Sequence, residues 1–223
     1  MRFACLMAFS LLVAGTAMAQ NIVVNPGFET GTFAPWVASP YGGLGGQPWL
    51  DGSSFFGSVP YSGSKFASNG CNQPACIGPD SGVGAWFYQD LATVNGATYT
   101  LSFYFSPGSG GAGAELQVLW GPTSVPLTIG PSGTCGGNCV YRTTAIGTKS
   151  YSLVTVSNLV ANSTSMRLEF IAEQDPDVSG IDDVSVVSVA SYSVPALSTG
   201  GLFALAAALV ATGLLLIRIA RPV

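Results

Sequence analysis

The stretch Tyr99-Thr-Leu-Ser-Phe-Tyr-Phe105 carries the clearest structural pattern in this sequence of 223 residues. Bulky apolar residues recur in it at every second position. Successive side chains of an extended chain point to opposite faces, so this alternation gives a strand with one apolar face. The residues on that face are Tyr99, Leu101, Phe103 and Phe105. A half-buried β-strand is therefore predicted here.

The same alternation recurs along the chain between clusters of Gly, Pro, Ser and Asn. In residues 166–172 it places Met166, Leu168 and Phe170 opposite Arg167 and Glu169. No amphipathic helix is visible before residue 197, and residues 39–63 and 107–113 lack a clear period. Short strands between turn residues are typical of an all-β sandwich. The expected strands are Ile22–Asn25, Trp36–Ala38, Lys65–Ser68, Ala85–Leu91, Thr98–Phe105, Glu115–Trp120, Val140–Ala145, Lys149–Val156, Ser165–Ala172 and Ile181–Val189.

Composition excludes several classes of function. The chain contains no histidine, which rules out Ser-His-Asp catalysis, Cys-His catalysis and His-ligated zinc. Residues 20–193 hold four basic and eleven acidic residues, a net charge of −7. Such a charge argues against binding to nucleic acid and against electrostatic docking on anionic lipid.

The first nineteen residues have the features of a secretory signal peptide. Arg2 provides a basic start, Phe3 to Val13 an apolar core, and Ala17-Met18-Ala19 a cleavage site of the Ala-x-Ala type. The apolar run is too short to favour a retained membrane helix. We expect residues 1–19 to direct export and residues 20–190 to form the folded domain.

The C-terminal segment is apolar and ends in basic residues. Residues 198–217 carry no charge and would span about 30 Å as a helix, the thickness of a bilayer core. Arg218 and Arg221 follow, and the positive-inside rule would keep them cytoplasmic with the β-domain outside. We therefore expect a single transmembrane helix within residues 194–223.

Directly before this helix lies the motif Val194-Pro195-Ala196-Leu197-Ser198. The tail resembles the bacterial C-terminal sorting signals that exosortases recognise, of the IPTL-CTERM and PEP-CTERM kinds. Val194 stands for the Ile and Ala196 for the Thr of Ile-Pro-Thr-Leu-Ser, and Gly200 takes the usual Trp position. The resemblance implies cleavage by an exosortase-like membrane protease and transfer to the cell surface or an extracellular polymer. A permanent single-pass anchor is the alternative.

Four cysteines remain after the signal peptide, an even number that suggests disulfides in an oxidising compartment. Their spacing favours two local bridges, Cys71 with Cys76 and Cys135 with Cys139. A tetrathiolate zinc site is a poorer alternative, because neither pair has the two-residue spacing of zinc knuckles. Pairing between the two loops is left open by the sequence.

Three segments carry a resemblance to a known fold. They are the run Asn21 to Gly31 with Phe33 and Trp36, the stretch from Ala85 to Phe103, and the run Ser179 to Val186. These are similar to the opening "N-G-G-F-E-x-G…W", the central hairpin and the closing "(L/I)-D-D-V-x-(V/L)" strand of galactose-binding-like jelly rolls, which include many carbohydrate-binding modules. The resemblance covers residues 21–187 and implies a jelly-roll β-sandwich.

Many members of that family hold a structural calcium ion where the first and last strands meet. Glu29 and one of Asp182 and Asp183 match the positions that supply its carboxylates. Asp182 is preferred, because in an alternating strand it shares the apolar face and would need a partner. The alternative is that these carboxylates cap turns by accepting backbone N–H bonds. A second, weaker acidic cluster comprises Glu173, Asp175 and Asp177.

Aromatic residues are candidates for carbohydrate binding, because sugar rings stack their apolar C–H faces on such rings. Trp36 and Trp120 are instead expected in the core. The expected ligand class is a polysaccharide or glycan. The candidate ligand-binding residues are Trp49, Phe55, Phe56, Tyr61, Trp86 and Tyr88.

The sequence thus predicts an exported, exosortase-sorted surface or extracellular-matrix protein that binds carbohydrate and has no catalytic activity. The alternative is a structural or adhesive envelope protein with protein partners and no sugar site. Glu115 and Glu169 could in principle serve glycoside hydrolysis, but nothing in the sequence places two carboxylates across a cleft.

Overall fold

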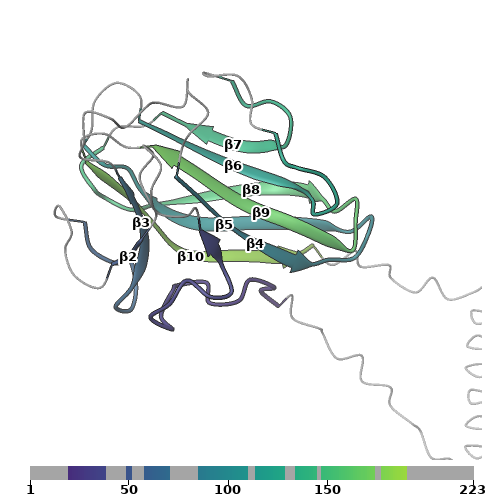
Figure 1. The fold of residues 1–223 in the computed structure, drawn as a ribbon, viewed down its shortest axis with the longest axis horizontal. Helices are drawn as coiled ribbons and strands as arrows, with labels where there is room; N and C mark the ends of the chain where they lie inside the picture. Colours follow the sequence, from purple (N-terminus) through teal and green to yellow (C-terminus); the bar gives the residue numbers. More distant parts are fainter. Residues whose placement is uncertain are drawn as a thin grey trace, which may run out of the picture. The chain divides into compact units, whose positions relative to one another are not determined.

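The computed structural model describes residues 20–38, 49–51, 58–70, 85–109, 114–128, 134–144, 147–173 and 177–189. The strands within these ranges form two five-stranded sheets, and all strand pairs are antiparallel (Figure 1). No helix long and apolar enough to cross a membrane occurs in this part of the chain. The predicted signal peptide, transmembrane segment, sorting motif and basic tail lie outside the described residues, as do Phe55, Phe56, Cys71 and Cys76.

Each sheet combines strands that are distant in sequence. Sheet I has the order β1 (Val37–Ala38), β4 (Ala85–Ala92), β9 (Ser165–Glu173), β6 (Glu115–Pro122) and β7 (Cys139–Thr143). Sheet II has the order β2 (Trp49–Asp51), β3 (Phe66–Gly70), β10 (Val178–Ser188), β5 (Thr98–Ser106) and β8 (Ser152–Val160). The all-β class predicted from alternation is confirmed.

Aromatic contacts join the two sheets. Phe103 of β5 and Phe170 of β9 are fully buried, and their ring centroids lie 5.1 Å apart across the sandwich. Phe170 also stacks on Phe87 of β4 at 5.0 Å. Each such ring stabilises the fold by about 1.5–3 kcal/mol through burial alone. The alternating strands therefore hold the sheets together with the faces predicted to be apolar.

The N-terminal segment lies along the C-terminal half of β10, beyond the residues that pair with β3, without forming a strand. Asn21 makes an isolated bridge with Val187, and the N–H of Ile22 donates to the carbonyl of Val186 at 2.9 Å. The predicted strand Ile22–Asn25 is wrong, because Asn25 adopts a positive φ of 53° and Pro26 has no N–H to continue a ladder.

One further strand was not predicted, and one strand boundary differs from the prediction. β2 lies inside residues 39–63, which have no clear period, and it pairs with β3 through Trp49 and Ser68. β8 begins at Ser152 instead of Lys149, because Lys149 has a φ of 61°, and it continues to Val160. The remaining predicted strands agree with the structure to within three residues at either end.

Candidate functional site

The outward face of sheet I brings aromatic and polar side chains together. Phe87 and Leu91 of β4 point into the core, so Trp86, Tyr88 and Asp90 point outward. The strand register continues these positions across the sheet. In the first row, Trp86 of β4 pairs with Ile171 of β9, and Ile171 pairs with Gln117 of β6. In the second row, Tyr88 pairs with Glu169, and Glu169 pairs with Leu119. In the third row, Asp90 pairs with Arg167.

Trp86 and Tyr88 form a stacked aromatic pair on this face. Their ring centroids lie 5.6 Å apart with an interplanar angle of 21°, and both residues are half-buried. The guanidinium of Arg167 lies 3.5 Å from the centroid of the Tyr88 ring and forms an ion pair with Asp90 at 2.7 Å. The guanidinium therefore covers one face of the Tyr88 ring, and the ion pair with Asp90 holds it there, which leaves the ring of Trp86 for a ligand. A planar ligand face can stack on such an arrangement.

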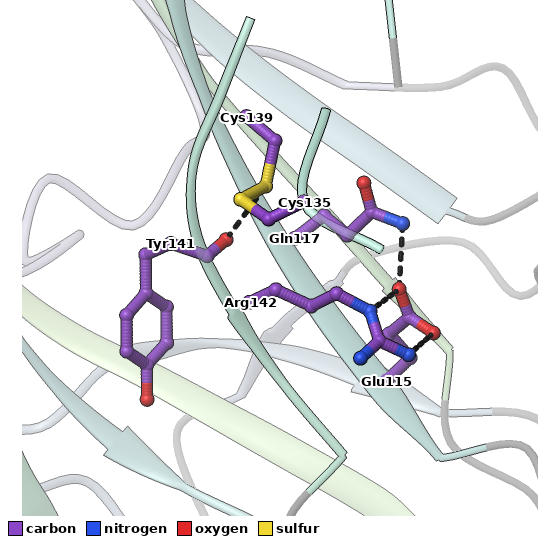
Figure 2. Close-up of a disulfide and its surroundings, with 6 residues drawn as sticks. All are labelled: Glu115, Gln117, Cys135, Cys139, Tyr141 and Arg142. Atoms are coloured by element: carbon purple, nitrogen blue, oxygen red, sulfur yellow. Dashed lines mark hydrogen bonds and ion pairs between the residues drawn. A yellow bond between two sulfur atoms is a disulfide. The ribbon is translucent and has the colours of Figure 1, made fainter. Parts of the chain in front are cut away.

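Polar side chains continue the surface toward β7. Gln117 is only 3 % exposed; its Nε2 donates to Oε1 of Glu115 at 2.6 Å, while its own Oε1 has no hydrogen-bond partner among the described residues. Arg142 donates from two nitrogens to the two oxygens of Glu115 at 2.8 and 2.7 Å (Figure 2). A buried acceptor without a partner costs about 1–3 kcal/mol. A hydroxyl of a ligand would satisfy it.

Glu169 lies between Tyr88 and Leu119 on the same face. Burial raises the pKa of its carboxyl, and nearby Asp90 raises it further, although Arg167 acts in the opposite direction. Glu115 is four residues along β6 from Leu119, the partner of Glu169, or about 13 Å at the usual rise per residue. The two carboxyls of a glycosidase lie about 5–9.5 Å apart. The backbone positions of Glu115 and Glu169 are therefore further apart than the carboxyls of a glycosidase.

The disulfide prediction is confirmed for one pair. Cys135 and Cys139 are bonded, with a Cα–Cα distance of 5.2 Å, and the bridge closes the turn that enters β7 (Figure 2). The Sγ of Cys139 lies 3.3 Å from the carbonyl oxygen of Tyr141. The bridge thus fixes the edge of sheet I beside Arg142. The other predicted pair, Cys71 and Cys76, lies outside the described residues.

The three carboxylates predicted as calcium ligands gather around Gly27. A Cβ added to Gly27 would lie 3.0 Å from Oδ1 of Asp183, 3.5 Å from Oδ1 of Asp182 and 3.8 Å from Cγ of Glu29. The absence of a side chain at Gly27 allows this approach. All three side chains also contact residues 61–65, the loop before β3.

The carboxylates in this cluster accept hydrogen bonds from that loop. Oδ2 of Asp182 accepts the N–H groups of Tyr61 and Ser62 at 2.9 and 3.1 Å. Oε1 of Glu29 accepts those of Ser64 and Lys65, both at 2.8 Å, and these bonds lower the pKa of Glu29. Burial raises the pKa of Asp182 to about 6 despite its hydrogen bonds. The geometry matches the turn-capping alternative.

Backbone N–H groups already donate to both oxygens of Asp182 and to Oε1 of Glu29, whereas Oδ1 of Asp183 and Oε2 of Glu29 accept only serine hydroxyls within the described ranges. Among the described residues, no three acidic or thiol side chains form a group that could hold a metal ion. Calcium binding by Glu29, Asp182 and Asp183 therefore stays a prediction.

Chelation separates the two alternatives. We expect the same melting temperature in excess EGTA and in about 10 mM calcium, a concentration above the dissociation constants of extracellular calcium sites. A rise of more than about 4 °C in calcium, equivalent to roughly 1 kcal/mol, would establish the metal site if Glu29→Gln removed it. Differential scanning calorimetry at pH 7 makes the measurement.

The predicted ligand-binding residues divide between the two sheets. Trp86 and Tyr88 share the outward face of sheet I, whereas Tyr61 stacks on Tyr104 of sheet II and Trp49 lies in β2. Gln117, Glu169 and Arg167 were not among the predicted residues. For Arg167 and Glu169 the signal is the alternation in residues 166–172, which places both on the face opposite Met166, Leu168 and Phe170.

Comparisons with known proteins identify the fold. No protein-family model matches the chain, and no curated protein matches it in sequence. The carbohydrate-binding module TmCBM61 in complex with beta-1,4-galactotriose is similar with a TM-score of 0.53 and 16 % identity over 75 % of this chain and 98 % of that one. The enzymatically active domain of tailspike protein 4 from bacteriophage CBA120 has a TM-score of 0.53 and 12 % identity over 76 % of this chain but only 21 % of its own.

A xylan-binding domain from carbohydrate-binding module family 22 has a TM-score of 0.46 and 17 % identity over 75 % of this chain and 95 % of that domain. At these identities the likeness concerns the fold alone. With the two antiparallel sheets, the likeness to TmCBM61 shows that the described residues between 20 and 189 adopt the jelly-roll β-sandwich fold that is found in carbohydrate-binding modules.

Proposed function

We propose that this chain is an exported, non-catalytic surface or matrix protein whose β-sandwich binds carbohydrate on the outward face of sheet I. The observation that carries the proposal is the stacked pair of Trp86 and Tyr88 on the same face of sheet I as Gln117, whose buried amide oxygen has no hydrogen-bond partner among the described residues; Ile171 of β9 stands between Trp86 and Gln117. Stacking and hydrogen bonding to hydroxyls are the two interactions by which proteins bind sugars.

The charges on this face are largely neutralised within the protein. Arg167 is paired with Asp90, and Arg142 with Glu115. A charged ligand would have to compete with these pairs, whereas a neutral sugar leaves them intact. The half-buried carboxyl of Glu169, whose pKa is raised, offers a further hydrogen-bonding group in the middle of the face.

The fold adds support of a more general kind. A module with the same fold was solved with beta-1,4-galactotriose. For this chain, the preferred ligand class is a neutral polysaccharide with accessible sugar faces. The adhesive alternative, in which the sandwich contacts other proteins, has no comparable observation in its favour.

Affinity electrophoresis of the full chain in mild detergent tests the proposal, with β-1,4-galactan, xylan or mixed-linkage β-glucan in the gel. We expect at least one polysaccharide to retard the protein and Trp86→Ala to weaken that retardation at least about tenfold, equivalent to about 1.4 kcal/mol. Val160→Thr, an exposed change in β8 of the other sheet, is the matched control and should bind normally. Absence of retardation by every polysaccharide would favour the adhesive alternative.

Export and sorting form a separate proposal that rests on the sequences of residues 1–19 and 194–223. If an exosortase-like protease processes the tail, mass spectrometry of the native protein should find a C-terminus close to Ser198. A mature chain that still ends beyond Arg221 would show a permanent anchor instead.

A further inference from the structure

A second aromatic pair lies on the opposite side of the sandwich from Trp86 and Tyr88. Phe103 and Phe105 of β5 point into the core, so Tyr104 between them points away from sheet I. The ring of Tyr61 stacks on Tyr104 with a centroid distance of 3.5 Å and an interplanar angle of 15°. The sandwich therefore carries one stacked aromatic pair on each outer face.

The second pair is accessible. Tyr61 is 44 % exposed although its ring contacts both Tyr104 and Tyr151. Leu153, directly opposite Tyr104 in β8, is 57 % exposed. The next outward pair along the same two strands is Ser102 and Thr155, which carry hydroxyls. The surface is a small aromatic platform with hydroxyls on the side of β8 and the carboxylates of Asp182 and Asp183 on the side of β10.

The loop that carries Tyr61 is held in place from below. The backbone N–H groups of Tyr61 and Ser62 both donate to the buried carboxylate of Asp182. The hydroxyl of Ser62 donates to Asp183 at 2.9 Å. Tyr151 supports the ring of Tyr61 edge-on, with a centroid distance of 5.6 Å. The ring is thus fixed before any ligand arrives, which lowers the entropy lost on binding.

Unused hydrogen-bonding groups lie on the same side of sheet II. The hydroxyls of Tyr151 and Ser106 are buried and have no hydrogen-bond partner within the part of the chain that the structure describes. Ser106 is paired with Gly180, and a Cβ added to Gly180 would come within 2.5 Å of the Tyr151 hydroxyl. Buried hydroxyls without partners are uncommon in folded proteins and point to a polar ligand or water.

We propose that Tyr61 and Tyr104 form a second sugar-binding platform, so that one domain binds polysaccharide on two opposite faces and cross-links chains. The inference rests on the proposed function of the Trp86 face. A protein partner is a poorer occupant, because a stable protein interface buries more than about 1,000 Å² and this platform consists of one exposed ring and one leucine among serine and threonine. Two faces directed apart cannot be covered by one straight chain segment, and binding two segments gives avidity.

The test compares the full chain with Tyr61→Ala, Trp86→Ala and the double variant, in gels that contain β-1,4-galactan, xylan or mixed-linkage β-glucan. We expect each single variant to weaken retardation several-fold and the double variant to lose it. We also expect the wild-type chain to raise the turbidity of the retarding polysaccharide, and either single variant to lose this cross-linking. Tyr61→Phe keeps the ring and should behave as wild type, which controls for the fold of the loop.

The outcomes separate the two proposals. If Tyr61→Ala leaves both retardation and turbidity unchanged while Trp86→Ala abolishes them, the second platform is overturned and the proposed function stands. If the wild-type chain is not retarded by any of the three polysaccharides, both fail. If Trp86→Ala has no effect and Tyr61→Ala abolishes retardation, sugar binds at sheet II alone and the bivalent proposal is overturned.

Discussion

Replacing Phe170 by alanine is expected to lower the free energy of unfolding by about 3–5 kcal/mol. The side chain is fully buried and contacts three other aromatic rings: Phe87 at 5.0 Å, Phe103 at 5.1 Å and Trp36 at 6.1 Å between centroids. These partners come from both sheets and from the N-terminal segment. The space left by the ring would not be refilled from one side, because strands of both sheets hold its walls.

Urea denaturation measures this effect as a fall in the midpoint with little change in slope. Val160→Ala, at an exposed position of β8, should change the free energy by less than about 0.5 kcal/mol. A loss below about 1 kcal/mol for Phe170→Ala would mean that the two sheets do not meet at this ring. Such a result would contradict the sandwich itself and with it the assignment of opposite outer faces.

Alternation in the sequence was enough to predict the central strands and their buried faces. Leu101, Phe103 and Phe105 of β5 and Met166, Leu168 and Phe170 of β9 are all buried, as the pattern indicates. The period fails where backbone geometry decides the outcome. Asn25 and Lys149 adopt positive φ angles, which end or delay a strand without any change in polarity.

The outward face of sheet I was harder to predict. The first seven residues of β6 are all buried. Glu115, Gln117 and Leu119 are therefore buried even though they lie on the outward side of the sheet. The polar network of Gln117, Glu115 and Arg142 spans two strands that are joined by more than fifteen residues, and a pattern within one strand cannot reveal it. Only the order of the strands in the sheet shows that these residues lie on the same face as Trp86.

Sequence also could not show that the candidate aromatic residues lie on different sheets. Trp86, Tyr88 and Tyr61 each follow the local pattern of an outward or loop residue, but strand order decides which face each one occupies. The cluster of Glu29, Asp182 and Asp183 was predicted to meet, and it does so around Gly27. Its contact with the loop of Tyr61 could not be read from the sequence, because that loop has no period.

Asp177→Ala is expected to lower the free energy of unfolding at pH 7 by about 2–4 kcal/mol. The Asp177 side chain is only 7 % exposed and forms an ion pair with Lys149 at 2.7 Å. Its Oδ2 also accepts the N–H of Ser109 at 2.7 Å and the hydroxyl of the same residue, and Oδ1 accepts the N–H of Val178 at 2.8 Å. One carboxylate therefore joins the end of β5, the segment before β8 and the start of β10.

The effect should depend on pH in a defined direction. Burial alone would raise the pKa of Asp177, but the bonds from Lys149, Ser109 and Val178 outweigh it and hold the pKa at about 2. Because the folded-state pKa lies below the usual 3.8, the ionised group stabilises the fold above about pH 4. That stabilisation is lost as the pH falls through 2, so the difference between the wild-type chain and Asp177→Ala should shrink toward pH 2.

Urea denaturation at several pH values between 7 and 2.5 measures this trend. Asp90→Ala is the matched control. Asp90, like Asp177, forms an ion pair, in its case with Arg167, but its side chain is 41 % exposed. Such exposed pairs contribute at most about 1 kcal/mol. If Asp177→Ala costs no more than Asp90→Ala at pH 7, or if its cost does not fall with pH, Asp177 does not hold the three segments together. Ser109 and Lys149 would then owe their positions to other contacts, and this end of the sandwich would be less cooperative than the buried network indicates.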